Sequence, residues 1–502
     1  MKSVRASLYF FFFSLSVAFV SAAFCATSVT ETGRVGVRRH IDLKPCRFAA
    51  YDTKVLCGKI DVFEDRTAQT GRKIDLHVVL LPALDSKPAP DPVFFLSGGP
   101  GQGAAKIASG GEDSLMSQLR RQRDLVFIDQ RGTGDSYPLN CNLSSNHVAA
   151  QNYFDELFPL ERIRACRTAL ERVSDLELYT TPIAMADLEE ARVALGYEKI
   201  NLYGISYGTL AALQYLHRYP KRVRALALAG VATPAAKLPL HFAKGAQAAM
   251  NKLLQDCAAE EGCRAAFPDL QADFARALAR LDSAPVSFVI PHPKSREAQS
   301  VRMSRGVFTE QLKNLLYDLT SASFVPLLIH RAARGEWTAF GKIVAGASMN
   351  ATHAPSLGTY LTVTCSESVP FINDDEIVRE TSGTFMGDYR IRAQRQACRE
   401  WPRGKVPATY FEPVISPAPV LMLSGELDGA TPAQLGADAA RSLSNSRQIL
   451  LRNTAHRYTS DCVTGIIAQF IAKGSAQELD IACADKLRRP SFAKELPARY
   501  IR

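Results

Sequence analysis

Short, predominantly apolar runs alternate along the chain with stretches that are apolar on one helical face only. Runs of about four to eight apolar residues without regular polar positions are typical of strands buried on both faces of a sheet. These runs cover residues 93–96, 125–129, 200–203, 223–229, 419–424 and 448–452. Between them, Ala184, Leu188, Ala191 and Leu195 recur at helical spacing. The alternation predicts an α/β fold with a mostly parallel, doubly wound sheet.

The pattern changes between residues 236 and 405. Apolar positions now recur at helical spacing in consecutive segments, and little of the sequence is typical of strands until residue 417. These segments are 242–257, 270–281, 308–319 and 324–333. We therefore predict a mainly helical insertion over residues 236–405, within an α/β core formed by residues 35–235 and 406–502.

Residues 1–23 have the features of a secretory signal peptide. Lys2 and Arg5 give a positive start, residues 8–20 form an almost unbroken apolar run, and residues 21–23 are small, as at a cleavage site. The apolar run is shorter than the roughly 20 residues of a membrane-spanning helix. We expect a secreted or periplasmic protein without stable membrane insertion after leader removal. A retained anchor, or lipidation at Cys25, is the alternative.

Charge and cysteine spacing narrow the classes of function. The formal net charge is +10, but the 60 basic residues are scattered along the chain. Scattered basic residues favour a solvated surface over a nucleic-acid site. None of the 11 cysteines forms a C-x-x-C pair, which removes the support for zinc ribbons and thioredoxin-like chemistry. We expect no metal, no cofactor and no nucleic-acid partner.

The ten cysteines that follow Cys25 fall into five sequential couples enclosing short to medium loops. An even number in an exported chain is typical of a disulfide set, although connectivity cannot be deduced from sequence. Pairing between neighbours is the simplest arrangement, and several buried free thiols are the alternative. The predicted bridges are Cys46–Cys57, Cys141–Cys166, Cys257–Cys263, Cys365–Cys398 and Cys462–Cys483.

A candidate nucleophile lies between an apolar run and a helical segment. Residues 204–208 read Gly-Ile-Ser-Tyr-Gly, a match to the G-x-S-x-G turn between a strand and a helix. The tight turn strains Ser206 and requires small residues two positions before and after it, which glycine provides. Ser206 then stands at a helix N-terminus, where a developing anion is stabilised. A plain strand–turn–helix without chemistry is the alternative.

A serine nucleophile needs a base within hydrogen-bond reach and a carboxylate that orients this base. Of nine histidines, only His456 lies beyond the resumed strands, directly after the run 448–452. Asp428 follows the run 419–424, and Glu426 is its nearest competitor. We therefore predict a Ser206–His456–Asp428 triad.

Two further turns follow buried strands in the first part of the core. Residues 97–103 read Ser-Gly-Gly-Pro-Gly-Gln-Gly, and glycine at this density lets the backbone approach a ligand and direct N–H groups at it. A phosphate loop is disfavoured because the Lys-Ser/Thr pair is missing. Residues 129–136 begin Asp-Gln-Arg-Gly. This turn either lines the site or, as we favour, braces the loops through an Arg–Asp pair.

Together these segments resemble the secreted tripeptidyl-aminopeptidase-like branch of the α/β hydrolases, which is related to the prolyl aminopeptidases. The matching elements are GGPG at 98–101, DQRGTG at 129–134, Asp187-Leu-Glu, GISYGT at 204–209, GELD at 425–428, Thr431-Pro432 and His456. The resemblance covers nearly the whole mature chain and is weakest across the insertion. It implies the α/β-hydrolase fold with the helical insertion as a lid.

The resemblance also implies roles for residues outside the triad. The oxyanion is expected to meet the N–H groups of Tyr207 and Gly99. Residues 365–367, Cys-Ser-Glu, resemble the stretch that supplies an acidic group for the free amine of the peptide, which makes Glu367 a candidate substrate-binding residue. A solvated surface glutamate is the alternative.

We accordingly expect a secreted serine exopeptidase that removes short peptides or single residues from free N-termini by way of an acyl-enzyme. A carboxylesterase or other acyl hydrolase with the same triad is the alternative, because a fold does not fix a substrate. A non-catalytic binding protein on this scaffold is less favoured, since no member of the triad is missing.

Overall fold

The computed structural model describes residues 41–48, 54–109, 114–141, 149–349 and 355–496. The predicted leader, residues 1–23, and Cys25 lie outside this part of the chain. Within it, no helix combines the length and the apolar character that crossing a bilayer requires.

A nine-stranded sheet forms the centre of the fold, in the order β1-β2-β3-β5-β4-β6-β7-β10-β11. The pairings from β1 through β2 and β3 to β5 are antiparallel, and those from β5 onwards are parallel. The predicted α/β fold with a mostly parallel sheet is therefore confirmed. The strands are β1 (Lys44–Cys46), β2 (Val55–Phe63), β3 (Lys73–Leu81), β4 (Val93–Leu96), β5 (Leu125–Ile128), β6 (Ile200–Ile205), β7 (Val223–Ala229), β10 (Val420–Gly425) and β11 (Ser446–Leu451).

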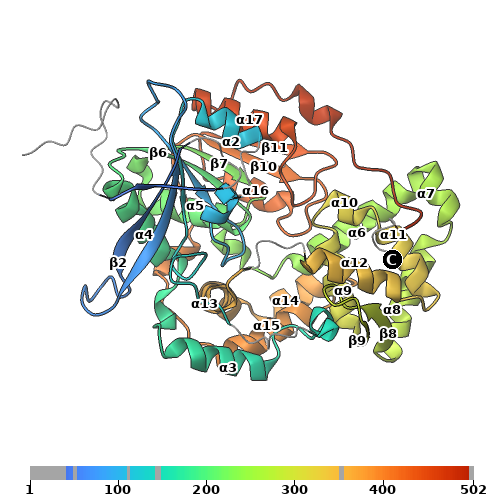
Figure 1. Cartoon of the computed structure of the whole chain (residues 1–502). Coiled ribbons are helices and arrows are strands. Elements are labelled where there is room, and N and C mark those ends of the chain that lie inside the picture. Colours follow the sequence, from blue (N-terminus) through green and yellow to red (C-terminus); the bar gives the residue numbers. More distant parts are fainter. Residues whose placement is uncertain (1–40, 49–53, 110–113, 142–148, 350–354, 497–502) are drawn as a thin grey trace, which may run out of the picture. The chain divides into compact units, whose positions relative to one another are not determined.

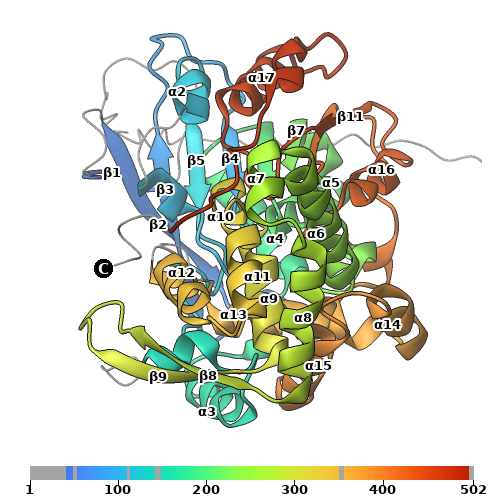
Figure 2. The ribbon, with the colours of Figure 1, turned by 90° about the vertical axis from the view of Figure 1, so that its right-hand side faces the viewer.

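Helices cover both faces of this sheet, which explains why its central strands have no polar face. All residues of β4, β5 and β10 are buried, and the two layers of helices enclose separate apolar clusters. One layer contains α4 (Thr181–Ala194), α5 (Tyr207–Arg218) and α16 (Ala433–Ala440), whereas α3 (Leu160–Glu171) lies further from the sheet (Figures 1 and 2). The opposite layer contains α1 (Ala105–Ser109), α2 (Ser114–Arg120) and α17 (Asp461–Lys473) (Figure 1).

Between β7 and β10 the described residues form ten α-helices and a β-hairpin. Figures 1 and 2 both show α6 to α12 grouped together on one side of the sheet. The helices are α6 (Phe242–Ala259), α7 (Glu261–Ala266), α8 (Leu270–Ser283), α9 (Arg305–Leu315), α10 (Leu319–Ala322), α11 (Val325–Ala333), α12 (Thr338–Met349), α13 (Leu357–Glu367), α14 (Asp374–Thr381) and α15 (Tyr389–Glu400).

The hairpin, β8 (Val286–Pro291) and β9 (Ala298–Met303), was not expected from the sequence pattern. Its strands are six residues long and alternate between buried and exposed positions, because one face packs on helices and the other meets solvent. Polar residues at positions 299, 300 and 302 leave β9 without an apolar run, and in β8 Ser287 and Pro291 leave only the short run 288–290.

Two separate cores divide the helical segment. The helices α6 to α12 and the hairpin share their own apolar cluster, in which Phe274, Phe308 and Phe340 are buried. Helices α13 and α15 instead contribute Leu361 and Ala397 to the cluster beneath α4 and α5. The last part of the predicted lid is therefore packed as part of the sheet's own core.

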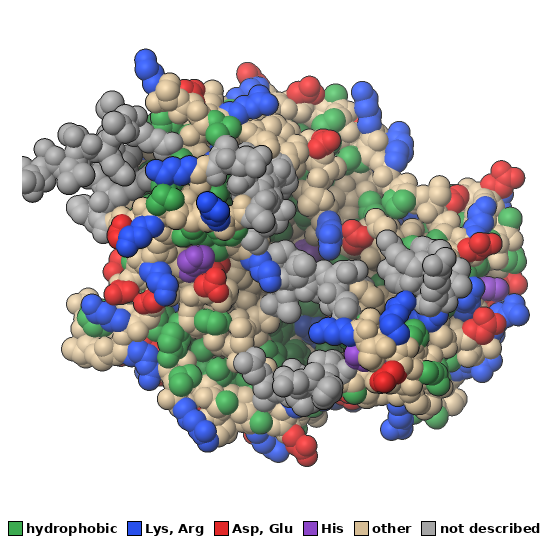
Figure 3. Space-filling model, viewed as in Figure 1, with side chains coloured by type: hydrophobic (Ala, Val, Ile, Leu, Met, Phe, Trp, Pro, Cys, Tyr) green, Lys and Arg blue, Asp and Glu red, His purple; other side chains and the backbone are tan. Residues whose placement is uncertain are grey.

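On the face in Figure 3, Lys and Arg side chains are interspersed with Asp and Glu and form no continuous basic patch.

Five disulfides join the cysteine couples that the sequence predicted. The bridges are Cys46–Cys57, Cys141–Cys166, Cys257–Cys263, Cys365–Cys398 and Cys462–Cys483.

Candidate active site

Ser206 occupies the turn between β6 and α5 in a strained backbone conformation. Its φ is 56° and its ψ is −124°, a combination that non-glycine residues seldom adopt. A Cβ at Gly204 would lie 2.5 Å from the carbonyl oxygen of Gly208, and one at Gly208 would overlap the carbonyl oxygen of Leu96. The two glycines are therefore required by the close approach of the backbone around Ser206.

The structure brings Ser206, His456 and Asp428 together. The Nε2 atom of His456 is 3.0 Å from Ser206 Oγ, and its Nδ1 atom is 2.8 Å from Asp428 Oδ2. Both distances are within hydrogen-bonding range. The imidazole can therefore remove the proton of Ser206 through one nitrogen while the carboxylate holds the other nitrogen protonated.

Asp428 is held in its ionised form by the loop that carries it. Its Oδ1 atom accepts the N–H groups of Ala430 and Thr431, and its Oδ2 atom accepts the hydroxyls of Thr431 and Tyr458. Burial opposes ionisation, but His456 and these hydrogen bonds together keep the pKa of Asp428 below its usual value.

Glu426, the rival candidate for the triad acid, lies apart from the histidine. Its side chain is exposed, and its Oε2 atom accepts the backbone N–H of Asn453. It forms no hydrogen bond with His456, whose Nδ1 faces Asp428. The geometry thus favours Asp428 as the triad acid.

The glycine loop after β4 lies directly against the nucleophile. A Cβ at Gly98 would be 3.3 Å from the Cβ of Ser206. The next residue, Gly99, has a φ of 110°, which favours glycine. The loop is held from the other side, because Ser356, just before α13, donates its N–H to the carbonyl oxygen of Gly101 at 2.9 Å. The assignment of Gly99 and Tyr207 as oxyanion donors stays a prediction.

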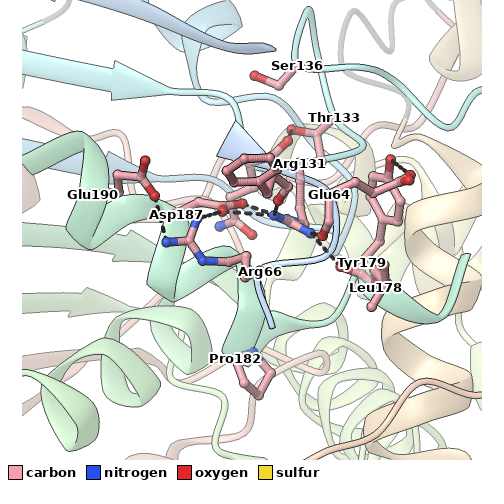
Figure 4. A network of polar contacts seen from close by, with 12 residues as sticks. Glu64, Arg66, Arg131, Thr133, Ser136, Leu178, Tyr179, Pro182, Asp187 and Glu190 are labelled. Carbon is pink, nitrogen blue, oxygen red and sulfur yellow. Dashed lines mark hydrogen bonds and ion pairs between the residues drawn. The ribbon is translucent and has the colours of Figure 1, made fainter. Parts of the chain in front are cut away.

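Arg131 braces the turn after β5 and does not reach the triad. Its buried guanidinium donates to both oxygens of Asp187 on α4, at 2.6 and 2.9 Å. A third bond joins it to the carbonyl oxygen of Leu178, and Arg66 contacts Asp187 from the opposite side (Figure 4). The bidentate pair is strong and geometrically specific. The turn therefore fixes α4 against the sheet, as the sequence interpretation favoured.

Glu367 is buried, which excludes the alternative of a solvated surface glutamate, and its assignment to the amine of a substrate stays a prediction. The residue is 1% exposed. One carboxylate oxygen accepts the N–H of Thr181 at 2.5 Å, and the other accepts the hydroxyls of Thr181 and Tyr410. An amine could reach the carboxylate only by displacing these donors. Burial raises its pKa to about 7, against the hydrogen bonds from Tyr410 and Thr181.

The buried Glu367 is nevertheless connected to the residue after the nucleophile. The hydroxyl of Thr181, which donates to Glu367, is also 2.7 Å from the hydroxyl of Tyr207. A chain of three side chains therefore runs from the end of α13 to the first residue of α5.

Three residues near the triad were given no role from the sequence. Tyr458 and Thr431 hold Asp428, and the ring of Tyr317 lies 5.0 Å from that of His456, between ring centroids. Tyr458 lies only two residues beyond the histidine, and proximity in sequence was the available signal. Tyr317 comes from the helical segment, and no sequence pattern connected it with His456.

Among the described residues, one group has the ligand types of a metal site. The Nδ1 atom of His77 is 3.5 Å from Asp129 Oδ2 and 3.8 Å from Asp135 Oδ2. Each oxygen of Asp129, however, accepts a backbone N–H, from Ala105 and from Asp135. These bonds give Asp129 a structural part in the turn, and we assign no metal to the group.

Comparison with known proteins finds several peptidases of similar sequence. Serine protease Hip1 of Mycobacterium tuberculosis is 25% identical over 488 residues, which cover 88% of this chain and 91% of that protein. The tripeptidyl aminopeptidase of Streptomyces coelicolor is 27% identical over 195 residues, 36% of either chain. A solved structure, the proline iminopeptidase of Mycobacterium smegmatis, covers 83% of this chain and 98% of its own at 16% identity, with a TM-score of 0.42. The family model of the alpha/beta hydrolase fold matches residues 91–457, a span that contains Ser206, Asp428 and His456. The chain therefore belongs to the α/β hydrolase family.

Proposed function

We propose that this α/β hydrolase is a serine exopeptidase that removes single residues or short peptides from free N-termini. The observation that carries the proposal is the complete triad, with contacts of 2.8 and 3.0 Å, in a chain that aligns over 88% of its length with a protein named a serine protease. The name of the shorter match, a tripeptidyl aminopeptidase, supports action at the N-terminus.

The reaction proceeds by transfer of the acyl group to serine and then to water. His456 removes the proton of Ser206 Oγ as this oxygen attacks the scissile carbonyl carbon, and it returns the proton to the leaving amine. Asp428 stabilises the imidazolium that forms between these steps. A water molecule, deprotonated by His456 in its turn, then attacks the acyl carbon, and His456 returns this proton to Ser206 Oγ as the ester bond breaks.

The negative charge of the tetrahedral intermediate needs hydrogen-bond donors close to Ser206. We assign this part to the N–H groups of Tyr207 and Gly99. Tyr207 is the first residue of α5, where N–H groups lack partners within the helix, and the glycine loop is packed against Ser206. Each such donor is worth roughly 3–4 kcal/mol of activation free energy.

An exopeptidase also needs a barrier that stops a long chain from passing through the site. The helical segment supplies groups in the right place, because Tyr317 lies against His456 and Asp318 is 3.6 Å from the guanidinium of Arg457. These contacts support a lid that closes one end of the substrate site. They also argue against an open cleft suited to internal cleavage.

Export fits the same proposal. The leader-like sequence of residues 1–23 and the five cysteine bridges are typical of a protein that folds in an oxidising compartment. We therefore propose a secreted or periplasmic location.

The test uses peptides that differ only at the N-terminus. The purified protein is incubated with a peptide panel in free and acetylated form, and products are identified by mass spectrometry. We expect release of one to a few residues from the free peptides only. Cleavage of esters without any peptide cleavage would instead indicate the carboxylesterase. Failure of a fluorophosphonate to label Ser206 would indicate a binding protein.

Replacement of the nucleophile provides the control for this panel. We expect Ser206→Ala to fold, because alanine is smaller, and to lower kcat by several orders of magnitude. Residual activity above about a tenth of the wild type would show that another residue is the nucleophile.

A further inference from the structure

The helical segment contains an ionic cluster whose three charged groups are almost completely buried. Glu310 and Lys313 lie on α9, and Arg390 lies at the start of α15. The Nζ atom of Lys313 is 3.0 Å from Glu310 Oε1, and Arg390 Nη1 contacts the same oxygen at 2.5 Å. The side chains of Glu310, Lys313 and Arg390 are 4%, 3% and 14% exposed.

Two cations in this cluster face a single carboxylate. Burial opposes the ionisation of Glu310, but Arg390 and Lys313 keep the pKa of Glu310 below its usual value. Burial also opposes the charge of Lys313, and Glu310 keeps the pKa of Lys313 above its usual value. In the described part of the chain neither cation has a second carboxylate partner. The cluster therefore holds one positive charge in excess, and a buried charge of this kind favours an anionic partner.

Buried polar atoms beside the cluster make no hydrogen bond with any described residue. These atoms are Arg390 Nε, Gln394 Nε2 and Glu310 Oε2. The other end of the Gln394 amide is fixed, because Tyr360 Oη donates to its Oε1 at 3.2 Å and accepts from Arg390 Nη2 at 2.7 Å. Arg390 and Gln394 are four residues apart on α15 and so share one face of the helix. Two N–H donors thus lie next to the excess positive charge.

One aromatic ring separates the cluster from the catalytic imidazole. The Nζ atom of Lys313 donates to Tyr317 Oη at 3.1 Å, and the ring of Tyr317 is 5.0 Å from that of His456. Phe242 presents its ring to Lys313 at 4.7 Å, an arrangement that attracts a cation without neutralising its charge. The cluster is therefore separated by one aromatic ring from His456, the base that contacts Ser206.

We propose that Arg390 and Lys313, with the amide of Gln394, bind a carboxylate of the substrate and so select substrates that carry an anionic group near the scissile bond. The proposal rests on the acyl transfer at Ser206 proposed above. The carboxylate has two possible sources, an acidic side chain in the acyl part or the C-terminal carboxylate of a short peptide.

The charges around the cluster disfavour a substrate amine at the same place. The unpartnered oxygen of Glu310 would attract an ammonium group. However, Lys313 and Arg390 both bond to the other oxygen of that carboxylate, so an ammonium would enter against two positive charges. A carboxylate instead neutralises the excess charge and meets the two unpartnered donors.

The first measurement needs no mutation. Matched substrates differ only in charge: free peptides with Glu or Gln at each of the first three positions, and short peptides ending in a carboxylate or an amide. A third pair is 4-nitrophenyl glutarate, which keeps one free carboxylate, and the same 4-nitrophenyl ester with this carboxylate converted to its methyl ester. We expect kcat/KM at least tenfold higher for the charged member of at least one pair. The peptide pair that responds identifies the source of the carboxylate.

The second measurement repeats these pairs with variants on α15. In Arg390→Gln we expect the ratio of charged to neutral substrate to fall close to one. Arg392→Gln is the matched control, because this arginine lies on the same helix, is 67% exposed and pairs with Asp388. We expect it to keep the wild-type ratio.

Each outcome bears on either the carboxylate site or the proposed exopeptidase. No preference for charge in the wild type overturns the carboxylate site. An equal loss on both members of each pair in Arg390→Gln also overturns it, since this result reports a purely structural role. A charge preference on esters without any peptide cleavage supports the site while rejecting the exopeptidase. Peptide cleavage without charge preference rejects the carboxylate site while supporting the exopeptidase.

Discussion

The carboxylate of Asp428 accepts hydrogen bonds from five donors, and one of them, the hydroxyl of Tyr458, helps to hold the carboxylate in place. His456 Nδ1 and the Tyr458 hydroxyl both meet Oδ2, at 2.8 and 2.7 Å. The Tyr458 hydroxyl also accepts the N–H of Gly425 at 3.0 Å. Tyr458 therefore fixes the position of the triad acid relative to the strand end from which its loop departs.

We expect Tyr458→Phe to lower kcat by about tenfold and to shift the loss of activity at acid pH to a higher pH. The hydroxyl lowers the pKa of Asp428, so its removal raises this pKa and allows protonation earlier in an acid titration. The measurement is a pH profile of kcat and kcat/KM.

Tyr197→Phe is the control for this experiment, because Tyr197 is also buried and donates to an aspartate, Asp124, at 2.7 Å. Both variants are expected to lose about 1–3 kcal/mol of stability. Only Tyr458→Phe is expected to move the profile. An unchanged profile in Tyr458→Phe would limit this residue to a role in folding.

Glu367 shows what a sequence conveys about a site residue and what it does not. The family-like stretch 365–367 pointed to this residue, but its environment depends on Thr181 and Tyr410, which are 186 and 43 positions away. Distant donors of this kind leave no pattern around the residue itself. The triad was predictable because motif, strand ends and chain order each restricted the choice to very few residues.

Burial of Glu367 makes the stability of the protein depend on pH. The pKa of Glu367 is about 7 in the folded protein, against 4.5 ordinarily, so the folded state binds the proton more tightly than the unfolded chain. The contribution of the protonated Glu367 to the free energy of unfolding is therefore complete below about pH 4.5 and is lost as the pH rises through about 7. This contribution amounts to about 3 kcal/mol.

We expect Glu367→Gln to flatten this dependence, as measured by urea unfolding between pH 5 and pH 8. Because Glu367 reaches Tyr207 through Thr181, any loss of activity should be equal for free peptides and for esters. A higher KM for free peptides alone would instead support the assignment of Glu367 to the substrate amine.

At the scale of elements, helix α6 approaches the loop of the triad acid very closely. A Cβ at Gly245 would overlap the carbonyl oxygen of Gly429, the residue after Asp428. Glycine inside a helix costs about 0.5–1 kcal/mol relative to alanine. Its presence at this point of α6 therefore reflects the contact with the loop.

We expect Gly245→Ala to lower the free energy of unfolding by about 1–3 kcal/mol and to reduce kcat, because the added methyl displaces the loop that carries Asp428. Gly465 in α17 is the matched position, since a Cβ there meets no atom within 4 Å. Gly465→Ala should gain about 0.5–1 kcal/mol and retain activity. If both substitutions stabilised the protein, the contact between α6 and the loop would not constrain the site.

The elements were predictable where burial imposes a simple pattern. The central parallel strands are buried on both sides and form apolar runs, and α8 and α11 have one apolar face. Helix α13 did not stand out, because it is buried almost all round, including Thr362 and Ser366. Its polar residues are satisfied by distant groups, such as the indole N–H of Trp401 and the N–H of Gly404.

At the scale of the whole molecule, the disulfides are local but differ in the length of chain that they close. Cys365–Cys398 joins α13 to α15 across 33 residues, within the core shared with the sheet. Cys257–Cys263 joins α6 to α7 across 6 residues, within the separate core of α6 to α12. Each core of the helical part therefore contains one bridge, and the two bridges restrict the unfolded chain to different degrees.

Loop closure predicts which of these bridges stabilises the protein more. A link across 33 residues removes about 3.7 kcal/mol of conformational free energy from the unfolded chain, and one across 6 residues about 2.2 kcal/mol. We expect Cys365→Ala/Cys398→Ala to lose about 1.5 kcal/mol more than Cys257→Ala/Cys263→Ala in urea unfolding. Non-reducing peptide mapping of the wild type should find each cysteine linked only within its own couple. A link between couples, or a larger loss from opening the shorter loop, would contradict this account of how the two cores are stabilised.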